Sequence, residues 1–338
     1  MRAQHAQPRR RALRQAVRWL VVVAAAVLLV AVAAGRWGEL ADVDLDLSPG
    51  WIVPATLVAT AANVLLALGW RRLLGAYGHA LGTARALRTW ALSQATRYLP
   101  SGLVPVAARA ALAAPDGVPR TIGAASVVVE TAALLGWAAL ACALWAPGGW
   151  IHPALRLVLG AAALAGLTTL PFTLAGVRTR DDGRVQAALT RLSRRFRFGA
   201  RVGELAAGGS LRARRAGVWG STGVYGVAVA ARLASFALLA AAVLPIGDGD
   251  GGIGPDVRLV VGAAAAATVV GMVGVTPAGL GVRETLLATL LADRFGFGDA
   301  LAYSVALRAW EIALETAFLA VVAYTGRRGA GVEKASGP

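Results

Sequence analysis

Long apolar stretches separated by short polar segments dominate this chain. About 20 apolar residues span the hydrocarbon core of a bilayer as a helix, because lipid offers the backbone no hydrogen-bond partners. Uninterrupted apolar runs therefore predict six full crossings. They lie near 17–35, 51–69, 121–146, 153–176, 217–244 and 300–325. The fold class expected is all-α, a polytopic transmembrane helical bundle, in which the first run after the basic start is a retained anchor and not a cleaved signal peptide.

Two further apolar regions, 86–113 and 257–293, are each interrupted by proline and glycine near the middle, which disfavours a straight helix through either. The breaks read Pro100-Ser101-Gly102-Leu103 and Pro277-Ala278-Gly279-Leu280. The charge pattern described next places both ends of each region on one face, so we expect two oppositely facing re-entrant hairpins. Two interpretations fit this similarity. Inverted repeats with broken helices are typical of transporters. If the similarity is a coincidence, the two regions are simply kinked helices.

Arginine placement predicts the orientation, because cytoplasmic connections are enriched in basic residues. Arginines crowd the segment 1–16, the connection after the second crossing, the loop 177–216 and the tail 327–338, whereas two other connections carry aspartates. We therefore expect a multi-pass protein of the cell membrane with both termini cytoplasmic and a single transmembrane domain over 17–326. Tryptophans near span ends are expected to be interfacial anchors. They are Trp19, Trp37, Trp51, Trp70, Trp150 and Trp219.

Composition agrees with a membrane protein and narrows the chemistry. Hydrophobic residues make up 57% and charged residues 15% of the chain, and the mean hydropathy is +0.62, unlike a soluble domain. The net charge of +16 lies mainly in short connections, so it indicates topology and not a nucleic-acid partner. One cysteine and three histidines offer no metal or cofactor motif. No phosphate-binding loop of the Gly-x-x-x-x-Gly-Lys kind is present, so direct ATP hydrolysis is not expected.

Charged residues inside the predicted crossings are the candidate site. An ionised side chain at the bilayer centre costs about 2.5–3.5 kcal/mol on insertion scales, so such residues usually face the bundle interior. At 100° per residue, Arg308, Glu311 and Glu315 form one polar stripe on the last crossing, with Trp310 facing the other way. Thr56, Thr60 and Asn63 form an uncharged stripe on the second crossing.

Two interpretations of these charges remain open. In the functional one, Arg97, Arg232 and Arg283 form a guanidinium path for a phosphate head group. Glu130, Glu311 and Glu315 then balance charge or take protons. In the structural one, the charges neutralise each other in buried pairs, such as Arg308 with Glu311, and only fix helix packing. Arg109 and Glu284, near half-helix ends, could either join the site or extend to the membrane interface.

The motifs resemble a known family. Arg97-Tyr98-Leu99-Pro100-Ser101-Gly102, then Glu130, then Thr276-Pro277-Ala278-Gly279-Leu280-Gly281-Val282-Arg283-Glu284 are similar to the lysylphosphatidylglycerol synthase transmembrane-region family of flippase-like membrane proteins. The resemblance covers about 15–326. It implies movement of a modified phospholipid or lipid-linked intermediate between leaflets. It also implies these motif positions: Arg97, Pro100, Gly102, Glu130, Pro277, Gly279, Gly281, Arg283, Glu284 and Arg308. The first motif departs from the pattern, with Val104-Pro105 where a second glycine is usual.

The predicted function is transport or leaflet flipping of an anionic lipid or lipid-linked intermediate. The partners expected are anionic or polyprenyl-phosphate head groups. The full synthases of the family carry an aminoacyl-transferase domain after the membrane region, and this chain ends at Pro338, so the synthase activity is not carried over. Two alternatives remain. A membrane glycosyltransferase could use Asp42, Asp44 and Asp46 in a short loop, where oxygen ligands suit a divalent cation. A non-catalytic accessory subunit could bind lipid beside a partner enzyme.

Overall fold

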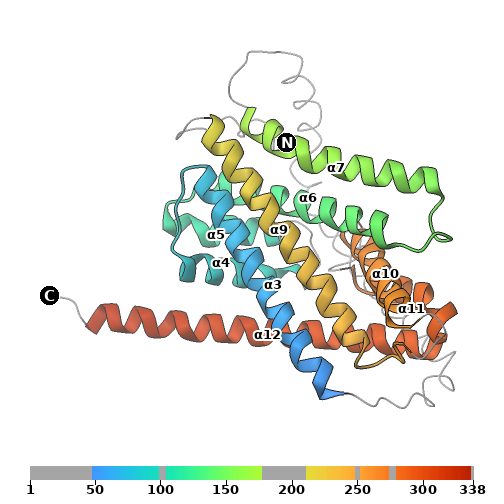
Figure 1. Cartoon of the computed structure of the whole chain (residues 1–338). Helices are drawn as coiled ribbons and strands as arrows, with labels where there is room; N and C mark the ends of the chain where they lie inside the picture. The colour runs from blue at the N-terminus through green and yellow to red at the C-terminus, as the bar shows by residue number, and fades with distance from the viewer. Residues whose placement is uncertain (1–47, 99–103, 177–210, 248–251, 274–278, 336–338) are drawn as a thin grey trace, which may run out of the picture.

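The structure, a computed structural model, describes residues 48–98, 104–176, 211–247, 252–273 and 279–335, and within them it is built of helices (Figure 1). The predicted first crossing, the acidic loop after it and most of the segment 177–216 lie outside these residues. The described helices are α3 (Pro49–Ala76), α4 (Thr83–Ala95), α5 (Val104–Ala113), α6 (Arg120–Trp145), α7 (Pro153–Gly176), α9 (Leu211–Ala240), α10 (Ile253–Val273), α11 (Val282–Phe295) and α12 (Phe297–Ala335), with the short 3₁₀ turns η1 (Thr96–Tyr98) and η2 (Ala114–Asp116).

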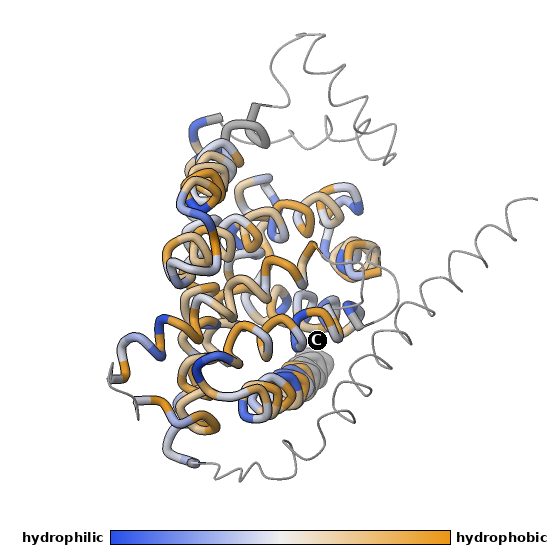
Figure 2. The backbone as a smooth tube through the Cα atoms, turned by 90° about the vertical axis from the view of Figure 1, so that its right-hand side faces the viewer, coloured by the Kyte–Doolittle hydropathy of each residue, from blue (hydrophilic) through white to orange (hydrophobic). Residues whose placement is uncertain are grey.

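Five of these helices are long and apolar enough to cross a membrane: α3, α6, α7, α9 and α10. Apolar positions, coloured orange, recur along the described helices in Figure 2. The first four overlap predicted crossings, and α12 overlaps the last one. The multi-pass membrane character of the chain follows from these helices, since each can satisfy its backbone hydrogen bonds internally.

Each of the two interrupted regions consists of two helices that pack against each other. α4 and α5 lie side by side on either side of the first break, and α10 and α11 do so on either side of the second (Figure 1). α10 alone is 21 residues long and meets the criteria for a crossing, which the sequence pattern had not indicated. The re-entrant path and the inverted repeat therefore remain predictions.

Among the described helices, α3 and α9 make the most extensive contact with each other. Small residues make it possible: a Cβ added at Gly69 would lie 2.7 Å from the ring of Tyr225, and one at Gly217 would lie 2.6 Å from the Cβ of Ala76. The Ser221 hydroxyl donates to the Gly69 carbonyl at 2.7 Å. Helices in lipid gain stability from such close packing and interhelical hydrogen bonds, so α3 and α9 form a firm base for the side chains they carry.

Candidate functional site

The last helix carries the predicted polar stripe, and two arginines from different broken regions meet it. Arg97, in η1 before the first break, forms an ion pair with Glu315. Arg283, in the first turn of α11 after the second break, places Nη1 2.8 Å from Oε2 of Glu311. Trp310 faces α3, where its indole nitrogen donates to Thr56 Oγ1 at 3.1 Å. One helix thus receives a guanidinium from each of the two broken regions.

Arg232 on α9 joins this group. Its Nη2 donates to the side-chain oxygen of Asn63 on α3 at 2.5 Å. It lies within electrostatic reach of Glu311, Glu315, Arg97 and Arg283. The three arginines predicted to form a guanidinium path are therefore close together, although they come from three separate segments of the chain.

Arg308 and Glu284 complete the network. Arg308 Nε lies 3.4 Å from Glu284 Oε1, and its Nη1 lies 3.9 Å from Glu311 Oε2. The predicted contact of Arg308 with Glu311 is thus longer than its contact with Glu284. Glu311 is already engaged by Arg283. We call Arg97, Arg232, Arg283, Arg308, Glu284, Glu311 and Glu315 the charge network.

Glycines after the second break shape the approach of α11 to this network. Gly279 and Gly281 have φ of +70° and +81°, values that side chains with a Cβ rarely adopt. A Cβ at Gly279 would also lie 3.0 Å from the Cα of Gly271 on α10. The Gly281 amide donates to Glu284 Oε2 at 2.7 Å and so closes the first turn of α11. These glycines allow the tight turn that brings Arg283 to α12.

Buried hydrogen-bond donors remain available at the centre of the site. Among the described residues, Nη1 of Arg232, Nη2 of Arg283 and Nδ2 of Asn63 have no hydrogen-bond partner, although each atom is buried. Asn63 is 2% exposed. Buried donors without partners are costly, so their presence together marks a place where a ligand with acceptor atoms would be stabilised.

Glu130 lies in a second, separate cluster. Its Oε2 accepts from Arg109 Nη1 at 2.7 Å and from the Tyr225 hydroxyl at 3.2 Å, and its Oε1 accepts from the Trp90 indole at 3.2 Å. Gln94 also donates to Oε1, at 3.5 Å. Because these donors come from α4, α5 and α9, Glu130 on α6 holds four helices together. Here the structural interpretation fits better than a head-group role.

Arg109 and Glu284 do not extend to the membrane interface, and that alternative was wrong. Arg109 is 2% and Glu284 4% exposed. The Arg109 guanidinium lies over the rings of Trp70 and Trp90, at 5.4 and 5.9 Å. Trp70 is likewise no interfacial anchor, since it is fully buried and donates to Ser126 Oγ at 2.8 Å. These contacts could not be predicted from the sequence, because each joins residues of separate helices.

Three motif residues, Pro100, Gly102 and Pro277, lie outside the described residues, as do Asp42, Asp44 and Asp46. Within the described part of the chain, no group of three or more histidine, cysteine or acidic residues could hold a metal ion. Arg97 and Arg283 each pair with a glutamate, and Arg232 donates to an asparagine. Within the described residues, the chemistry available at this site is that of guanidinium, carboxylate and amide groups.

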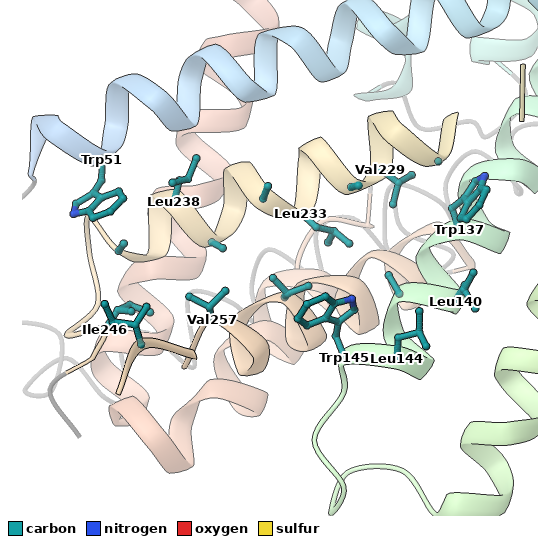
Figure 3. A pocket seen from close by; sticks show the side chains of 18 residues that line it. Trp51, Trp137, Leu140, Leu144, Trp145, Val229, Leu233, Leu238, Ile246 and Val257 are labelled. Carbon is teal, nitrogen blue, oxygen red and sulfur yellow. The ribbon is translucent and has the colours of Figure 1, made fainter. Parts of the chain in front are cut away.

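An apolar cavity of about 600 Å³ lies on another face of α9 (Figure 3). It is lined by side chains of α6, α9 and α10, with Trp51 from the start of α3 at one end and Trp137 at the other. Leu233 lines it, whereas the neighbouring Arg232 reaches α3. The helix thus carries an apolar hollow on one face and a member of the charge network on another, and no charged side chain of the described residues lines the hollow.

The fold and the site together define a polytopic α-helical membrane protein with buried charges gathered beside two broken helical regions. The chain belongs to the family of the lysylphosphatidylglycerol synthase TM region, whose match covers residues 11–318. Membership gives the chain a function related to membrane lipid. No curated protein is similar enough to this chain to count as a relative.

Proposed function

We propose that this protein moves an anionic lipid or lipid-linked intermediate between the leaflets of the cell membrane, and that Arg97, Arg232 and Arg283 bind its head group. The observation that carries this proposal is their convergence on one face of α12 from three separate segments. Guanidinium groups match phosphate oxygens in geometry as well as charge, because their donors form a fixed fork.

The ion pairs of the arginines with Glu311 and Glu315 support a route along which a head group could move, as well as a site at which it binds. Carboxylate and phosphate compete for the same donors, so an arriving head group can replace a glutamate at each arginine in turn. The displaced glutamates remain close and stop the site from holding the anion too tightly. A transported group needs this balance, since binding must be strong enough to enter and weak enough to leave.

Membrane context supports the rest of the proposal. The arginines of the connecting segments would lie on the cytoplasmic side with both termini, where they would attract anionic lipid. Glu311 and Glu315 are the groups through which a proton could accompany the substrate. A partner enzyme of a lipid or glycan pathway would supply or consume the transported molecule.

Reconstitution of the full chain into proteoliposomes tests the proposal directly. Leaflet exchange of fluorescent anionic lipids should be fast with the unaltered protein and at least about tenfold slower with Arg232→Ala or Arg283→Ala, as expected for loss of a charge-assisted contact. Arg85→Ala is the matched control. It removes a guanidinium that is 59% exposed and paired with Asp116, and neither residue belongs to the charge network. Equal exchange in the wild type and the two site variants would contradict the proposal.

A further inference from the structure

Arg232 differs from the other two arginines of the proposed path in the kind of partner it has. Arg97 and Arg283 each form an ion pair with a glutamate of α12. Among the described residues, Arg232 forms no ion pair, and its guanidinium donates to the neutral side chain of Asn63 at 2.5 Å. An anion that reaches Arg232 therefore has no ion-paired carboxylate to displace there.

The orientation of the Asn63 amide follows from this contact. A guanidinium has only donors, so the amide must face Arg232 with its oxygen and keep its nitrogen for another group. Within the described part of the chain, neither Asn63 Nδ2 nor Arg232 Nη1 has a hydrogen-bond partner, although both atoms are buried. The two hydrogen-bonded side chains thus offer one neutral and one charged donor to an external acceptor.

Asn63 differs in this respect from the threonines of its stripe on α3. Thr56 donates to the Ile52 carbonyl at 2.8 Å and Thr60 to the Thr56 carbonyl at 2.7 Å, so both hydroxyl protons are used by the helix itself. Close packing of α3 against α9 holds Asn63 beside Arg232. The free donor of Asn63 is therefore built into the most extensive helix contact of the described bundle.

We propose that Asn63 and Arg232 together form the position at which the head-group anion first binds, and that Asn63 contacts the head group directly. This inference rests on the proposed function and gives its site an order of binding. Phosphate oxygens satisfy both unpaired donors, whose burial without a partner is costly. At Arg97 or Arg283 the same anion must compete with a glutamate for the donors it needs. The ion pairs therefore act after this first contact, during movement of the bound head group.

Binding of a short-chain lipid to the purified full chain in detergent tests this order. Dioctanoyl phosphatidylglycerol is titrated by calorimetry. Arg232→Met should weaken its binding at least about tenfold, because a charge-assisted hydrogen bond is lost. The double variant Arg283→Met with Glu311→Gln removes an ion pair as a unit. It should weaken binding by less than about threefold, since these donors are already occupied, yet it should slow leaflet exchange.

Two substitutions of Asn63 test its direct contact. Asn63→Asp keeps an acceptor for Arg232, but it replaces the free donor with a carboxylate oxygen and gives that arginine an ion-pair partner. Binding should fall at least about tenfold. Asn63→Leu removes the donor without adding a charge and should weaken binding several-fold. Thr60→Val is the matched control, because the Thr60 hydroxyl is bonded to its own helix, and it should leave binding unchanged. Thermal unfolding shows that each variant is folded.

The outcomes separate this inference from the proposed function. If the unaltered protein exchanges no anionic lipid, the proposed function itself fails. If it exchanges lipid, and Asn63→Asp and Asn63→Leu bind and exchange as the unaltered protein does, the direct contact of Asn63 is wrong. If the double variant weakens binding as much as Arg232→Met does, the order of binding is wrong. In both of these cases transport can still stand.

Discussion

Glu311 and Glu315 lie one helical turn apart on α12, and each accepts an arginine from a different broken region of the chain. Residues four apart share a face of a helix, so both ion pairs lie along one line. The connection spans much of the sequence, because Arg97 and Glu315 are separated by 218 positions. This line joins the two broken regions to the last described helix.

The ion pair of Arg283 with Glu311 should behave as a coupled unit in a double-mutant cycle. Breaking a buried pair on one side leaves an uncompensated charge and costs about 3–5 kcal/mol, whereas removing both partners costs less. Arg283→Met and Glu311→Gln should each lower the Tm in detergent by more than the double variant does. Additive losses of Tm would show that the two side chains do not interact.

Substitution at Gly279 should impair both folding and exchange. Gly279→Ala places a Cβ at a φ of +70° and 3.0 Å from the Cα of Gly271, so the turn that presents Arg283 must shift. We expect a loss of about 1–3 kcal/mol of stability and slower leaflet exchange. Gly223→Ala on α9 is the control, since a Cβ there meets nothing within 4 Å. Similar Tm and exchange for both variants would contradict the role of Gly279.

Replacement of Glu130 should affect stability more than transport. Glu130→Gln removes the charge that Arg109 faces at 2.7 Å in a cluster where both residues are almost fully buried. We expect a marked fall in Tm, and a smaller fall for Tyr225→Phe, which removes one hydrogen bond to Glu130 and no charge. Exchange per folded molecule should stay close to that of the unaltered protein. Loss of exchange without loss of Tm would instead place Glu130 in the transport site.

The predicted orientation can be checked by labelling. Cys142 is the only cysteine and is buried. In a Cys142→Ser background, Gln186→Cys in the arginine-rich segment should react with a membrane-impermeant maleimide only after the cells are opened. Asp44→Cys should react in intact cells. The reverse pattern would show that the basic segments lie outside.

Much of the helical order could be predicted from the sequence, because apolar runs of the right length allow few other structures in lipid. α6 and α7 match their predicted runs closely, whereas α3 continues past its run as far as Ala76. The α10 helix was not predicted as a possible crossing, since the proline and glycine that follow it suggested a break near the middle of one unit. The region made of α10 and α11 begins at Ile253 and ends at Phe295, a few residues beyond the predicted bounds of 257–293 on each side.

Which residues belong to the site was partly predictable from the sequence, but which of them form ion pairs with each other was not. Helical periodicity placed Glu311 and Glu315 on one face, but which arginine reaches each one depends on how the helices cross. The spacing of 21 residues between Arg109 and Glu130 gave no sign of their contact. Asn63 had a signal, its place in a polar stripe on α3, yet only the unpaired donor beside Arg232 distinguishes it from the threonines of that stripe.

Placing both carboxylates on one continuous helix has a mechanical consequence. A rotation or slide of α12 would move Glu311 and Glu315 away from their arginines together, so release at one end favours release at the other. A shift of either broken region alone would open only its own pair. Movement of α12 would therefore open both ion pairs in concert, whereas movement of one broken region would open its own pair alone, so α12 is the element that couples the two pairs.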